Sequence, residues 1–114
     1  MERILEITNP MLLSVGIIFI VCGLIMYIFP PKKINSLYGY RTAASMKSQA
    51  KWDFAQTYSA KIMGLMGLAL IAFSFYRSYL SLSNDQHAIF GLAILIASAV
   101  SLIVIVEKAL RKIE

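Results

Sequence analysis

Three hydrophobic spans limit what this chain can fold into. They run from Met11 to Phe29, from about Ile62 to Leu82 and from about Ala88 to Val106. The first and third contain no charged residue, and the second contains only Arg77, near its end. A bilayer core about 30 Å thick needs about 20 helical residues to cross it, and Arg77 can extend its guanidinium into the interface. The sequence therefore predicts three transmembrane helices.

The composition agrees with this interpretation. The chain has 114 residues, enough for one domain at most. Hydrophobic residues make up 59% of it and charged residues 15%, against about 45–50% and about 25% in a typical soluble domain. We therefore expect residues 1–114 to form a single all-α integral membrane domain. The first span exceeds the roughly 7–15 apolar residues of a signal peptide and lacks a small-residue cleavage site, which predicts a retained anchor.

Basic residues fall unequally on the two sides of such a bundle. Three spans place the first loop and the C-terminus on one side, which holds nine basic residues: Lys32, Lys33, Arg41, Lys47, Lys51, Lys61, Lys108, Arg111 and Lys112. The other side holds Arg3 and Arg77. Because cytoplasmic loops are enriched in Lys and Arg, we predict a cytoplasmic first loop and C-terminus and an external N-terminus. The net charge of +5 then suits the anionic lipids of the inner leaflet and requires no nucleic-acid partner.

The first loop, residues 30–61, is the one long polar segment between spans. Pro30 and Pro31 end the first helix, and Lys32 and Lys33 are expected in the headgroup layer. Residues 34–40 predict a turn that dips back toward the membrane. In that turn Gly39 most simply adopts a positive φ.

Polar and aromatic residues in the same turn are candidates for recognition. Asn35 is expected to satisfy backbone groups of the loop. Tyr38 and Tyr40 suit the membrane interface, with the ring buried and the hydroxyl in water. Arg41 is a plain inside-positive charge, a bidentate clamp for a phosphate or carboxylate, or a partner of Glu107 at the same membrane face.

A helical pattern begins near Ala44, with Thr42 or Ser45 as its N-cap. An apolar stripe then recurs at every fourth position: Met46, Ala50, Phe54 and Tyr58. Lys47 and Lys51 border the stripe. This predicts an interfacial amphipathic helix that lies on anionic lipid before the second span begins.

Trp52 does not belong to that stripe. At 3.6 residues per turn it points about 160° away from Phe54, among small and polar residues. A tryptophan in that position packs against the Tyr38–Arg41 turn or meets a partner, and the sequence leaves both open.

Small residues recur along all three spans. The third span carries Ala93, Ala97 and Ser101 at four-residue spacing, the second carries Ala60, Gly64 and Gly67, and the first carries Gly16 and Gly23. In lipid, such residues let helix backbones approach closely. The pattern predicts a compact three-helix bundle, self-association, or both.

Several function classes are disfavoured. No ionisable residue lies deep in a span, whereas ion-coupled transporters keep such residues for function. Cys22 has no partner cysteine, and His87 is expected in a solvated external turn. The sequence shows no nucleophile–base pair and no metal-ligand cluster. We therefore expect no catalysis, no cofactor and no metal.

The order of the loop residues resembles that of the SdpI-type family of bacterial membrane proteins. The matching positions are Pro30, Asn35, Tyr38, Gly39, Tyr40, Arg41, Thr42 and Trp52. The Gly-Tyr-Arg-Thr core with a tryptophan ten residues further on is the specific part, and the likeness covers roughly Pro30 to the end of the second span. The resemblance implies a short, three-span version of a family whose name-giving member has additional spans.

The resemblance also implies a function. The name-giving member of the family protects Gram-positive cells from a secreted, membrane-active toxin made by their siblings, and it holds a cognate transcriptional repressor at the membrane. The first hypothesis is thus immunity, through binding of a peptide toxin within the bilayer of the bacterial cytoplasmic membrane. A signalling scaffold that captures a soluble repressor and a holin-like pore former are the alternatives.

Overall fold

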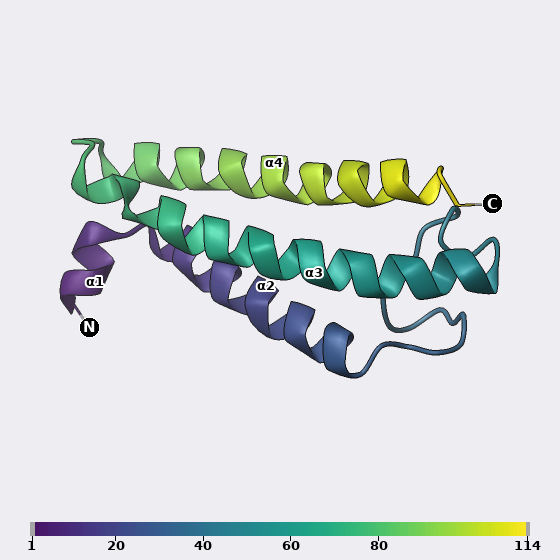
Figure 1. Ribbon diagram of the computed structural model, residues 1–114. Coiled ribbons are helices and arrows are strands. Elements are labelled where there is room, and N and C mark those ends of the chain that lie inside the picture. Colours follow the sequence, from purple (N-terminus) through teal and green to yellow (C-terminus); the bar gives the residue numbers. More distant parts are fainter. Residues whose placement is uncertain (1, 114) are drawn as a thin grey trace.

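The structure, a computed structural model, describes residues 2–113, which form four α-helices and one short 3-10 helix. Their bounds are α1 Glu2–Ile7, α2 Pro10–Ile28, α3 Gln49–Ser74, η1 Phe75–Ser78 and α4 Asn84–Leu110. Three helical segments are long and apolar enough to cross a membrane: Pro10–Ile28, Gln49–Ser78 and Asn84–Leu110. In Figure 1, α4 runs along α3, and α2 lies against α3 at an angle. The predicted all-α membrane fold with three spans is confirmed.

Each long helix begins at a side-chain cap that its sequence encodes. Asn9 precedes α2, accepts a hydrogen bond from the backbone N–H of Met11, and is followed by Pro10 at the first helical position, where the missing N–H costs nothing. Ser83 and Gln86 form a reciprocal capping box at the start of α4. These caps satisfy backbone donors that would otherwise be orphaned at the helix ends.

The predicted interfacial helix is not a separate element. Its residues from Gln49 onward are the first turns of α3, which continues unbroken into the second span. Ser48 caps this helix by accepting from the backbone N–H of Lys51, not Thr42 or Ser45 as predicted. Phe54 and Tyr58 pack against a core that includes Val106 and Leu110 of α4, so half of the predicted lipid-facing stripe is used inside the protein.

Glycines bring α2 and α3 into backbone contact. A Cβ atom at Gly16 would lie 2.8 Å from the carbonyl oxygen of Gly67, and one at Gly67 would lie 2.6 Å from that of Gly16. A Cβ at Gly23 would lie 2.9 Å from the carbonyl oxygen of Ala60. All three distances are shorter than real Cβ contacts, so a side chain at any of these positions would force the two helices apart. The predicted packing role is thus confirmed for Gly16 and Gly23 of the first span and for Gly67 of the second, whereas a Cβ at Gly64 would meet nothing within 4 Å.

The small stripe of the third span is placed differently. Ala93, Ala97 and Ser101 are all exposed on the outer surface of α4. The face that α4 turns inward instead carries Leu102 and Val106. The third stripe therefore takes no part in packing within the chain, and its role in self-association stays a prediction.

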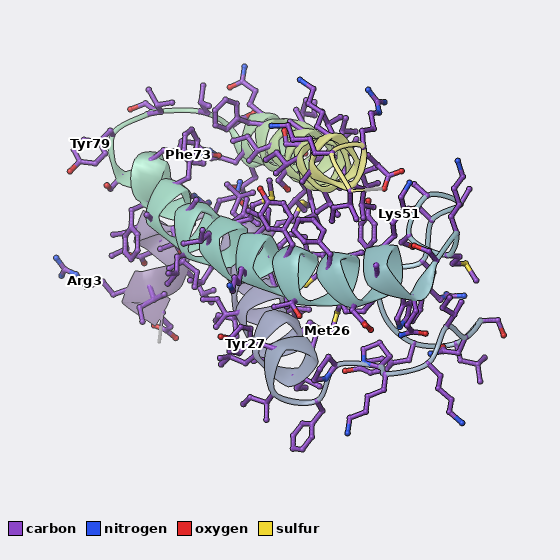
Figure 2. The ribbon with its side chains drawn as sticks, turned by 45° about the vertical axis from the view of Figure 1, so that its right-hand side comes forward. Arg3, Met26, Tyr27, Lys51, Phe73 and Tyr79 are labelled. Atoms are coloured by element: carbon purple, nitrogen blue, oxygen red, sulfur yellow. The ribbon has the colours of Figure 1, made fainter. Side chains whose placement is uncertain are left out.

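The bundle has two distinct ends. Residues 29–48 connect α2 to α3 and lie at the same end as the C-terminus, which we call the motif end (Figure 1). The helix α1 and the turn between η1 and α4 lie at the opposite end, which we call the far end. In Figure 2, Lys51 lies at the motif end, whereas Arg3 and Tyr79 lie at the far end. This arrangement places the strongly basic first loop and the C-terminus on one side, as three spans require.

Candidate functional site: the motif segment and its cavity

The motif segment, residues 30–48, is folded rather than free, and Asn35 organises its first turn. The side-chain oxygen of Asn35 accepts from the backbone N–H groups of Leu37 and Tyr38, at 2.9 and 2.8 Å. Its amide nitrogen donates to the carbonyl oxygen of Lys33 at 2.9 Å. The interpretation of Asn35 as a residue that satisfies loop backbone groups is confirmed.

A side chain at position 39 is disfavoured for two reasons, the backbone conformation of Gly39 and the space around it. Its φ is +107°, in the region that favours glycine, which confirms the predicted positive φ. A Cβ at this position would also lie 2.5 Å from the side-chain oxygen of Gln56. The turn can therefore press directly against α3.

Trp52 and Gln56, one turn apart on α3, hold the motif segment down. Trp52 is fully buried, and its indole N–H donates to the carbonyl oxygen of Pro31 at 2.7 Å. Gln56 is also buried; its oxygen accepts from the N–H of Tyr40 at 2.7 Å, and its nitrogen donates to the carbonyl of Tyr40 at 2.8 Å. Trp52 thus meets the loop of its own chain. Gln56 was not predicted, although a polar residue one turn after Trp52 on the same face was a usable signal.

Glu107 of α4 links the motif segment to the third span. One of its carboxylate oxygens accepts from the hydroxyl of Tyr40 at 2.9 Å and from that of Thr42 at 3.0 Å. Burial raises the pKa of the Tyr40 phenol, and the hydrogen bond and charge of Glu107 raise it further. The phenol therefore stays protonated and donates at physiological pH.

Arg41 does not pair with Glu107, and that predicted option is wrong. Its side chain is exposed, and its guanidinium donates to the carbonyl oxygen of Ser36 within the loop. Because a single carbonyl uses one of the five guanidinium N–H donors, Arg41 keeps donors available for an anionic partner.

Tyr38 and Thr42 complete the segment. The hydroxyl of Tyr38 donates to the carbonyl oxygen of Phe29 at 2.9 Å, where α2 ends. Thr42 and Ser45 exchange side-chain to backbone hydrogen bonds with each other. Both predicted N-cap candidates therefore close a turn inside the loop rather than start the helix.

A cavity of about 280 Å³ lies between the motif segment and the helices. Its loop side is formed by Gly39, Tyr40, Arg41 and Thr42, and its helix side by Met26, Ser59, Met63, Leu102 and Ile103. The cavity therefore combines an exposed cation and hydroxyl groups with an apolar wall that includes two flexible methionines. Figure 2 shows Met26 on α2 beside Tyr27.

The structure brings together four of the seven predicted site residues at this cavity, namely Gly39, Tyr40, Arg41 and Thr42. The other three support the loop: Asn35 and Tyr38 from within it and Trp52 from below. Among the predicted lipid-facing residues, Lys32, Lys33 and Lys47 are exposed and Lys51 is half-buried. Among residues 2–113, no group of three His, Cys, Asp or Glu side chains could hold a metal ion.

A second polar cluster lies at the far end, and it corrects the placement of His87. His87 is 6% exposed rather than solvated, and a ring nitrogen lies 2.9 Å from the hydroxyl of Tyr76. Asn9 donates to that hydroxyl at 3.0 Å and to the carbonyl of His87 at 2.9 Å. Arg77 donates to the carbonyls of Leu5 and Thr8, where α1 ends. The cluster ties the start of α2 to η1 and α4.

The fold and this loop together define a multi-pass helical membrane protein with a structured, basic connection after its first span. Comparison of the sequence with known proteins relates this chain to one family. The SdpI/YfhL protein family matches residues 32–106. The chain is 38% identical over 96 residues to the uncharacterized protein YfhL of Bacillus subtilis (strain 168), which covers 84% of this chain and 82% of the relative. The chain therefore belongs to the SdpI/YfhL family, as the sequence resemblance implied. No solved structure matches it.

Proposed function

We propose that this protein confers immunity against a membrane-active peptide by binding it in the membrane at the motif end. The cavity beneath the motif segment is the observation that carries this proposal. It unites four of the eight residues on which the resemblance to the SdpI-type family rests with apolar side chains of all three spans. An amphipathic peptide presents the same combination of surfaces, with an apolar face for the methionine wall and a polar face for Arg41 and Thr42.

The loop architecture supports binding by a preformed site. Gln56 and Glu107 fix Tyr40 from two different helices, so the cavity wall is ordered before a ligand arrives. Preorganisation reduces the entropy that binding costs. Trp52 then acts through the loop it supports, and we assign direct contact with the peptide to Arg41 and to the cavity wall.

Filling the cavity tests this function. Ile103 lines the cavity and is 49% exposed, whereas Ile96 lies two turns earlier on α4, is 57% exposed and does not line it. We expect Ile103→Trp to abolish protection of toxin-sensitive bacteria that express the protein and Ile96→Trp to preserve it. Survival against a panel of secreted peptide toxins is the measurement, with immunoblotting of membranes to confirm equal insertion. Full protection by Ile103→Trp would contradict the proposed site.

A signalling scaffold is the second candidate, and the exposed surface of the motif segment favours it. Leu37 is 90% exposed, and Lys32, Lys33 and Lys47 of the same segment are exposed as well. An exposed apolar side chain in a basic segment suits an acidic soluble regulator. If such a regulator co-sediments with membranes and the Leu37→Ser substitution abolishes this co-sedimentation, the scaffold is favoured. Leakage of a dye from cells that express the protein would favour the holin-like alternative.

A further inference from the structure

A larger apolar groove lies between α2 and α3 and shares no residue with the motif cavity. Its volume is about 460 Å³. Residues of α2 form one wall and residues of α3 the other: Ile20, Gly23, Leu24 and Tyr27, then Ala60, Lys61, Gly64, Leu65 and Leu68. The role proposed for the motif segment leaves this groove unexplained.

The groove exists because Gly64 has no side chain. A Cβ built at Gly64 would meet nothing within 4 Å. This contrasts with Gly16, Gly23 and Gly67, where a Cβ would collide with the facing helix. Helix packing therefore explains why those three residues lack a side chain. The backbone of Gly64 also lies against α2, since its nitrogen is 3.1 Å from the Cβ position of Gly23, but its own Cβ would point into open space, so packing does not explain why residue 64 is a glycine.

The groove faces the hydrocarbon region of the bilayer. Leu24, Leu65 and Leu68 on its walls are 55%, 63% and 59% exposed, and both helices are apolar enough to span the membrane. Water gains no hydrogen bonds from such walls, so an apolar cavity of this kind does not hold it. An apolar chain from the surrounding membrane is the occupant that this chemistry fits.

One end of the groove carries a positive charge. The ammonium nitrogen of Lys61 lies 5.9 Å from the centre of the Tyr27 ring, within the range of a cation–π contact. Both residues stand nearer the motif end than Ile20 and Leu68, because α2 ends and α3 begins there. An occupant that complements the groove therefore has an apolar chain and an anionic head at the motif end.

We propose that this groove binds one anionic phospholipid from the leaflet at the motif end. An acyl chain lies along Gly64 between the two helices, and the phosphate lies beside Lys61 at the depth of Tyr27. The charge of Lys61 selects for an anionic headgroup, since a lysine attracts the negative lipid surface. The binding does not depend on the immunity role, because it involves neither the motif cavity nor a peptide.

Native mass spectrometry of the purified protein with added lipids tests the proposal. The probes are phosphatidylglycerol and phosphatidylcholine with identical acyl chains. We expect the wild type to retain one phosphatidylglycerol in preference to phosphatidylcholine. Lys61→Gln should reduce that preference about fivefold, the factor that one lysine near an anionic surface supplies. Lys61→Arg should preserve it.

The Gly64→Leu variant distinguishes lipid bound in the groove from lipid bound elsewhere on the surface. Its side chain fills open space, so we expect the variant to keep the wild-type helix content and to lose retention of both lipids by about tenfold or more. Ala69→Leu is the matched control, because Ala69 is exposed on the same helix and does not line the groove. Unchanged lipid retention by a folded Gly64→Leu variant, or equal retention of the two lipids by the wild type, would overturn the proposal. Retention of an added amphipathic peptide in place of lipid would also overturn it.

Discussion

One carboxylate oxygen of Glu107 accepts hydrogen bonds from the hydroxyls of Tyr40 and Thr42, which makes Tyr40 a sensitive reporter of how the motif segment is held. Hydrogen bonds to charged groups contribute about 1.5–3 kcal/mol. We expect Tyr40→Phe to lower the free energy of unfolding in detergent micelles by about that amount. Circular dichroism during denaturant titration measures it.

The same hydrogen bond predicts an alkaline transition. The pKa of Tyr40 is raised in the folded state above the unfolded value of about 10. Its contribution to stability is therefore complete below pH about 10 and is lost as the pH rises toward the higher folded pKa. Tyr40→Phe should lack this additional loss, whereas Tyr38→Phe should retain it because Tyr40 is still present. An identical alkaline loss in wild type and Tyr40→Phe would contradict the role of the bond.

Residue roles that depend on neighbours in the chain could be predicted, and those that depend on distant partners could not. Asn35 forms hydrogen bonds to backbone groups two and three residues away, and the positive φ of Gly39 follows from its residue type. Local sequence patterns were therefore sufficient to predict both roles. Asn9 meets the carbonyl of His87 across 78 positions, and no local pattern encodes that contact. A lone histidine near a turn was therefore placed in solvent although the fold buries it.

At the scale of the helices, Gly64 and Gly67 of α3 are predicted to respond oppositely to the same substitution. A Cβ at Gly67 would lie 2.6 Å from the carbonyl oxygen of Gly16, whereas one at Gly64 would meet nothing within 4 Å. We expect Gly67→Ala to push α2 from α3 and to cost about 1–3 kcal/mol, the usual range for overpacking. Gly64→Ala should be neutral or slightly stabilising, because alanine favours helix. Unfolding in mixed micelles compares the two variants, and equal stabilities would contradict the close contact between the helices.

The helices themselves were predictable to different degrees. The bounds of α2 differ by one residue from the predicted span, because Pro10 favours the first helical position and Pro30 and Pro31 cannot continue the helix. The start of α3 was misplaced because Thr42, Ser45 and Ser48 are all acceptable caps, and tertiary contacts decide among them. The continuity of α3 also follows from tertiary packing, since α4 covers Phe54 and Tyr58, which an interfacial helix would have given to lipid.

For the whole molecule, the largest dimension is 49 Å, enough to cross a bilayer of about 40–45 Å including its headgroups. We therefore expect the motif segment and the far-end turn to contact opposite aqueous faces. The positive-inside pattern predicts that the motif end lies in the cytoplasm. This orientation follows from the distribution of basic residues and not from the packing of the helices. A proposed site at the motif end would then meet a peptide only after it enters the membrane.

Single cysteines in a Cys22→Ser background test this orientation, since Cys22 is the one native cysteine. Ser36 is exposed in the motif segment, and Ser81 is exposed in the turn before α4. We expect a membrane-impermeant maleimide to label Ser81→Cys in intact cells and to label Ser36→Cys only after the cells are permeabilised. Labelling of both sites under permeabilised conditions is the control for accessibility. The opposite pattern in intact cells would place the motif cavity on the external face and would require the peptide to be bound before it enters the bilayer, so this measurement also decides at which step protection acts.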